Sequence, residues 1–181
     1  MVSELTPIQT DRAILRRALA RLGVSLFEHT PAGEVPRPSV AELAELVIAL
    51  AESRDARLEA SIPCLLAVTS GERAHAVVAA AAVLRPALGI QLGWLYRLTR
   101  ALVDSRRPDL ERLFGALPEP PPSELETVAL PDPSVLHGEA TLWAASERAR
   151  DRGEPDVAGG VVRLFDKWIR LRADEVALER A

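Results

Sequence analysis

The sequence predicts an all-α protein, either an irregular helical bundle or a short stack of helices, ending in a helical hairpin that follows a proline-rich acidic linker. Three observations support this class. Hydrophobic residues make up 48% of the chain but aromatic residues only 4%, so alanine, leucine and valine dominate, and alanine is the best helix former. Apolar residues recur at helical spacing in several segments. No segment shows the sustained period-2 alternation of a half-buried strand.

The first helix is expected from about Ile8 to Leu22, with Gly23 as its natural stop. Leucines and alanines at helical spacing give it one apolar face. Four arginines lie off that face, and they are candidate contacts for nucleic-acid phosphates: Arg12, Arg16, Arg17 and Arg21. A solvated helix face is the simpler interpretation of the same pattern.

The second helix has a clear start, because Ser39 and Glu42 have the spacing of a capping box. Asp55 is expected to cap the next helix after the tight Ser-Arg-Asp break. Proline 63 then leaves two possibilities. Either one helix kinks at Pro63, or a short helix ends near Ser61 and a new one begins with the proline in its first turn.

An alanine-rich helix is expected from about Glu72 to Leu84, before Pro86. Its small side chains let neighbouring helices approach closely, so we expect it to be the central helix. A further helix is expected from about Leu88 to Asp104, and a short one follows at Asp109. Over about residues 39 to 104 this succession of short helices resembles a HEAT or armadillo stack in architecture.

The chain changes character at Pro118. Six prolines occur from Pro118 to Ser134, and no lysine or arginine occurs between Arg112 and Arg148. Such a segment is typical of a stiff, extended linker. We therefore divide the chain into a helical body (1–117), a linker (118–136) and a C-terminal helical hairpin (137–181), whose helices are expected at about 137–150 and 160–180.

The last helix is apolar over about 200° of its circumference, wider than the ~100° stripe of a surface helix. Such a helix needs cover on most sides. Either the main body covers it as core, or another protein does. The second interpretation makes its apolar side chains a partner-binding anchor: Phe165, Trp168, Ile169 and Leu171.

Charge and cysteine content restrict the function. A net charge of −4 argues against the basic surface that sequence-independent binding of nucleic acid requires. A single cysteine cannot form an intramolecular disulfide. With no signal peptide and no stretch of about 20 apolar residues, a soluble cytoplasmic protein without membrane contact is expected.

No catalytic or metal site is predicted, and no cofactor. The histidines, His29, His75 and His137, lack metal-ligand spacing, and the sole Glu-x-x-His, from Glu72 to His75, is one copy of a motif that di-iron bundles need twice. Cys64 lies in an apolar run, where a thiol is usually an inert core residue. Glycine-rich phosphate loops and nucleophile elbows are absent.

The stretch SRDARLEASIPCLL, Ser53 to Leu66, resembles a segment of small helical proteins that accompany minimal nucleotidyltransferases in toxin–antitoxin-type pairs. The HEPN ribonucleases, the better-known helical partners in such systems, carry Arg-x(4–6)-His. Here Arg73 is two residues before His75, and Arg21 is eight before His29. The ribonuclease motif is therefore absent, and the resemblance implies no activity.

These observations favour a non-enzymatic helical interaction protein, a scaffold, adaptor or regulatory subunit that works by protein–protein binding or self-association in a bacterial cytosolic complex. The alternative is a nucleic-acid-associated regulator or antitoxin-like partner that uses the arginines of the first helix.

Overall fold

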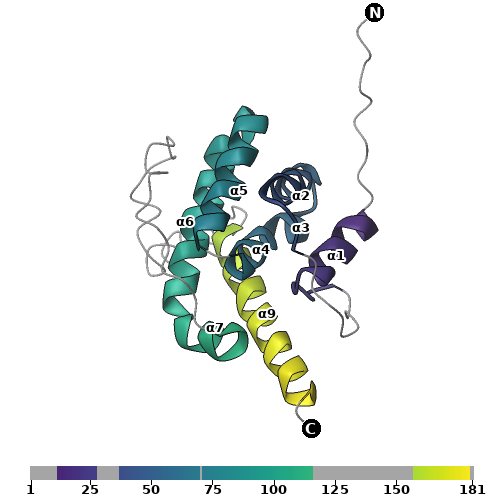
Figure 1. Cartoon of the computed structure of the whole chain (residues 1–181), viewed down its shortest axis with the longest axis vertical. Coiled ribbons are helices and arrows are strands. Elements are labelled where there is room, and N and C mark those ends of the chain that lie inside the picture. The colour runs from purple at the N-terminus through teal and green to yellow at the C-terminus, as the bar shows by residue number, and fades with distance from the viewer. Residues whose placement is uncertain (1–11, 28–36, 70, 116–156, 180–181) are drawn as a thin grey trace, which may run out of the picture.

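A computed structural model describes residues 12–27, 37–69, 71–115 and 157–179, and these residues are mostly helical with no strand among them, which confirms the all-α class (Figure 1). The first three helices are α1 (Arg12–Arg21), α2 (Val40–Glu52) and α3 (Ala56–Ala60). After them come α4 (Ile62–Val68), α5 (Gly71–Leu84), the 3₁₀ turn η1 (Pro86–Leu88), α6 (Gly89–Ser105), α7 (Arg107–Phe114) and α9 (Val157–Glu179).

The predicted helix starts at Ser39 and Asp55 are confirmed. The Ser39 hydroxyl accepts the backbone N–H of Glu42 at 3.2 Å, and the Glu42 carboxylate accepts the backbone N–H of Ser39 at 2.6 Å. Because Ser39 donates to the charged carboxylate, the pKa of Glu42 is lowered. One oxygen of Asp55 accepts the backbone N–H groups of Arg57 and Leu58.

Proline 63 marks a new helix. Helix α3 ends at Ala60, Ser61 separates the two helices, and α4 begins at Ile62 with Pro63 in its first turn. A proline there costs nothing, since the first-turn N–H groups have no partner within the helix. The second of the two sequence interpretations therefore holds.

Helix α4 is the central helix of the bundle, and the expectation that α5 holds that place is wrong. Five consecutive residues from Ile62 to Leu66 are buried. Helices α2, α3, α5, α6 and α9 all pack against α4. A helix that contacts five others in this way belongs to an irregular bundle, because in a linear stack each repeat contacts only its neighbours.

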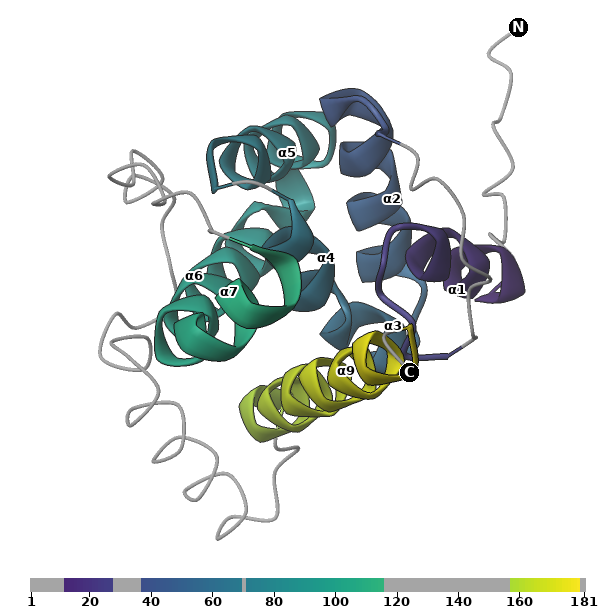
Figure 2. The same ribbon diagram turned by 60° about the horizontal axis from the view of Figure 1, so that its bottom comes forward.

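Helix α9 runs across the bundle beside α3, α4 and α7 (Figure 2). It is thus part of the helical body, and the expected separation of a C-terminal hairpin from the body is wrong for this helix. The linker and the first hairpin helix, at 118–136 and 137–150, lie outside the described residues.

Candidate functional site

The predicted anchor on α9 is buried in the chain's own core. Trp168 is 1% exposed, and Phe165 and Ile169 are also buried, while Leu171 is partly buried against the same core. The prediction that these residues form a partner-binding surface is therefore wrong for Phe165, Trp168 and Ile169. The body covers them, as the core interpretation of the apolar helix required.

Trp168 connects three parts of the bundle. Its ring stacks on Phe114 of α7 at 5.4 Å between centroids and meets Phe165 edge-on at 5.3 Å. The indole N–H donates to the carbonyl oxygen of Gly23 at 3.1 Å. Gly23 follows α1 with φ of +86°, a left-handed conformation that favours glycine. This contact joins the ends of the described sequence across 145 residues.

A second polar contact ties α9 to the junction of α6 and α7. The Arg106 guanidinium donates to both oxygens of Asp166, at 2.9 and 3.2 Å. This two-pronged geometry is the strong form of an arginine–carboxylate pair. Together with Trp168 it fixes α9 on the body, so the α9 side chains are structural.

The nucleophile candidate is inert. Cys64 is fully buried in α4, and burial raises the pKa of its thiol far above the ordinary value. His75 on α5 meets the ring of Tyr96 on α6 edge-on, with centroids 6.1 Å apart. His29 and His137 lie outside the described residues. Within the described ranges, no group of three metal-binding side chains gathers.

Tyr96 is an unusual polar group in this core. Its hydroxyl is buried and has no hydrogen-bond partner among the described residues. Burial raises the pKa of Tyr96, and the positive charge of Arg100 partly offsets that rise. The pKa therefore moves further from neutrality, which makes the phenol a poor acid–base group at physiological pH.

The arginines of α1 fall into two pairs. Arg12 and Arg16 approach Asp55, which caps α3, at 3.7 and 4.0 Å. Arg16 also lies over the Phe27 ring, 5.5 Å from its centroid. Arg17 and Arg21 are exposed. The structure thus places Arg12 and Arg16 beside the start of α3, a neighbour that the sequence did not indicate.

Sequence reasoning missed an apolar surface at the end of α5. Val83 is 79% exposed and Leu84 51% exposed, and Pro86 and Ala87 of η1 are exposed beside them. We call these four residues the α5 edge; it lies at the upper end of α5 in Figure 1. The signal was present in the sequence: no charged residue occurs between Arg73 and Arg85. The small side chains of the same segment predicted a central helix instead.

Comparison with known proteins gives no family model, curated protein or solved structure that matches this chain. Residues Ser53–Leu66, the stretch for which the sequence predicts a resemblance to nucleotidyltransferase companions, span α3 and the first part of α4. Its first half includes exposed side chains, and its second half, from Ser61 to Leu66, is buried. Among the described residues, no helix is long and apolar enough to span a bilayer.

Proposed function

We propose that this chain is a non-enzymatic helical interaction protein, a scaffold, adaptor or regulatory subunit that acts by protein–protein binding in a bacterial cytosolic complex. The observation that carries this proposal is the uncovered apolar α5 edge. Isolated exposed apolar residues are ordinary, but contiguous ones mark interaction surfaces. Here Val83, Leu84, Pro86 and Ala87 are exposed in one run, interrupted only by Arg85.

Helix α5 has small or apolar side chains on its outer side as well as on its inner face. Its inner face packs on α2, α4 and α6. The outer positions that precede the edge are partly exposed alanines, among them Ala76, Ala79 and Ala80. Small side chains let the backbone of another helix come close. A helix that is apolar around most of its circumference is normally buried on most sides.

The occupant that this surface fits is a second copy of the chain. Arg85 and Glu52 form an ion pair at 3.3 Å beside the edge, and both side chains are about half exposed. Because this pair is closed within the chain, it leaves no unpaired charge beside the edge. A copy related by a two-fold axis presents the same apolar edge and the same closed pair. A symmetric dimer therefore buries the edge without burying an unpaired charge.

Sedimentation velocity of the purified full chain, from low to high micromolar concentration, tests this proposal. We expect a reversible dimer. Burying a valine or leucine side chain contributes about 1.5–3 kcal/mol, so Val83→Asp should raise the dimer dissociation constant tenfold or more. Leu178→Asp is the matched control, because Leu178 is a 74% exposed residue near the end of α9. That variant should dimerise like the wild type.

Two outcomes would overturn the second-copy assignment: a wild-type chain that stays monomeric, or a dimer weakened equally by both variants. Should the chain be monomeric, a photo-crosslinking amino acid at position 83, with one at position 178 as control, decides whether another protein occupies the edge in the host cell. An adduct of one defined mass at position 83 alone supports protein binding by the edge. Absence of any adduct overturns the interaction function.

A further inference from the structure

The charge of the described helices differs in sign from that of the whole chain. The described residues hold 18 arginine and lysine side chains and 13 aspartates and glutamates, a net charge of +5. The full chain has 22 and 26, a net charge of −4. The acidic surplus lies in the remaining segments. A net charge summed over the whole chain therefore hides a basic helical body.

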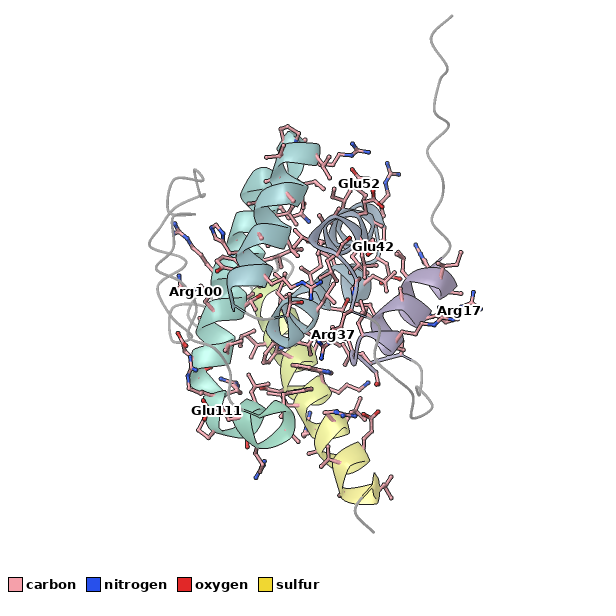
Figure 3. The ribbon with its side chains drawn as sticks, viewed as in Figure 1. Arg17, Arg37, Glu42, Glu52, Arg100 and Glu111 are labelled. Carbon is pink, nitrogen blue, oxygen red and sulfur yellow. The ribbon has the colours of Figure 1, made fainter. Side chains whose placement is uncertain are left out.

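The basic residues are concentrated where α1 meets the start of α3. No aspartate or glutamate occurs from Arg12 to Phe27. Two more arginines flank Asp55 in sequence, and both are exposed. We call these side chains the arginine corner: Arg12, Arg16, Arg17, Arg21, Arg54 and Arg57. Figure 3 shows Arg17 extending from α1 away from the body.

Asp55, the acidic residue among them, neutralises little of the charge that faces solvent. Its side chain is only 14% exposed. One oxygen already accepts the two backbone N–H groups that it caps. The other lies 3.7 and 4.0 Å from the guanidinium groups of Arg12 and Arg16, distances too long for hydrogen bonds. The N–H donors of these arginines therefore keep hydrogen-bonding capacity for a ligand.

We propose that the arginine corner binds the phosphate backbone of nucleic acid, which extends the proposed function but does not depend on it. A guanidinium group is planar, always charged and matched to phosphate in a two-pronged contact. From Arg12 to Arg21 the helix rises about 13 Å, over which one DNA strand presents about four phosphates at 3.4 Å spacing. The contacts are to backbone phosphates, so binding is independent of base sequence.

The same charges could attract an anionic membrane, but α1 does not have the second feature that membrane binding needs. An interfacial helix inserts an apolar face into the lipid. The apolar face of α1, Leu15, Leu19 and Ala20, is buried against the bundle, and Ile14 is the single large apolar side chain of α1 that is exposed. The observations therefore favour nucleic acid as the ligand of the arginine corner.

Fluorescence anisotropy of labelled 30-base-pair duplex DNA, duplex RNA and single-stranded DNA, titrated with the purified full chain, tests the proposal. With four to five phosphate contacts, affinity should fall roughly 10²-fold between 50 and 200 mM salt. The three probes distinguish DNA from RNA as the preferred source of phosphate. Binding by any of them with this salt dependence supports the proposal.

Three variants separate the arginine corner from general charge. Arg17→Ala with Arg21→Ala should reduce the salt slope by about two. Lys167→Ala with Arg170→Ala removes the same charge from exposed positions of α9 and should leave binding unchanged. Asp55→Asn keeps a side-chain oxygen for the cap and removes the negative charge, so it should tighten binding several-fold at 50 mM salt.

The proposal is overturned by an absence of binding at 50 mM salt, or by equal losses in the α1 and α9 double variants. It is also overturned if nucleic acid does not bind while vesicles with 30% anionic lipid sediment with the wild type and not with the Arg17/Arg21 variant. Circular dichroism of each variant confirms that it has folded, so loss of binding reports on the surface. Dimerisation through the α5 edge is measured separately and can fail without affecting this result.

Discussion

Helices α5 and α9 have similar sequences in one respect and opposite places in the fold. Both are apolar around most of their circumference, α5 through alanine and valine, α9 through larger residues. The sequence predicted α5 as the centre, and it left α9 as either core or an outward anchor. In the structure, Val83 of α5 is exposed and Trp168 of α9 is buried. The comparison shows that the larger side chains fill the core, because they exclude more surface from water.

Trp168→Ala should have the largest effect on this comparison. The substitution removes the ring that stacks on Phe114 and the N–H that donates to Gly23, and it leaves a cavity. Core tryptophan truncations cost about 3–5 kcal/mol. Urea denaturation of the purified chain measures the loss. Trp168→Phe, which keeps a ring but not the donor, should cost clearly less; a loss under 1 kcal/mol for Trp168→Ala would contradict the core role of α9.

Arg106→Ala should have a smaller effect, about 1–2 kcal/mol, because it leaves Asp166 without its charge-assisted hydrogen bonds. Asp166 is partly exposed, so water compensates some of the loss. A double-mutant cycle with Asp166→Asn isolates the pair. Coupling near zero would mean that α9 is held by its apolar contacts alone.

Helix α2, which packs against α5, begins with the Ser39–Glu42 capping box. The stability that this capping box contributes to the folded chain should depend on pH. The pKa of Glu42 is lowered in the folded state from its ordinary value of 4.5. Its stabilising effect is therefore fully present above pH 4.5 and is lost as pH falls through the lowered pKa. Thermal unfolding between pH 6 and 3 should show a small loss of stability that is reduced in Glu42→Gln, because that variant lacks the titrating carboxyl that accepts the Ser39 backbone N–H. Parallel pH curves for the two proteins would contradict this.

Val83→Asp should have the smallest effect on the stability of the monomer, within about 0.5 kcal/mol, because the side chain contacts mostly water. Urea denaturation at a concentration that favours the monomer measures it. A loss above 2 kcal/mol would show that Val83 belongs to the core, and the contrast between α5 and α9 would fail.

Local structure could be predicted from the sequence where one or two residues determine it. Ser39 with Glu42, Asp55 and Gly23 each act within a few positions, and each of these predictions is confirmed. At Pro63 the sequence left two possibilities, and the structure shows a new helix. Whether a given apolar face is covered depends on helices far away in sequence. Helix periodicity shows that α9 has a wide apolar face, but not that Phe114 and Gly23 lie against it.

The sequence did not indicate the α5 edge and indicated only the α1 part of the arginine corner, for related reasons. The α5 edge has the composition of a core helix, so its exposure follows only from the packing of its neighbours. The arginine corner needs Asp55 and its flanking arginines beside α1, a contact between segments about 40 residues apart. The net charge of the whole chain pointed away from it.

The claim that the α5 edge meets its own copy is tested most directly by oxidative cross-linking of single added cysteines. The native Cys64 is buried and stays unreactive in the folded chain. With Val83→Cys, we expect rapid formation of a disulfide-linked dimer, resolved by non-reducing mass analysis, because the two thiols face each other near the two-fold axis. Leu178→Cys should cross-link only slowly through random collisions. Equal, slow cross-linking at both positions would contradict the account.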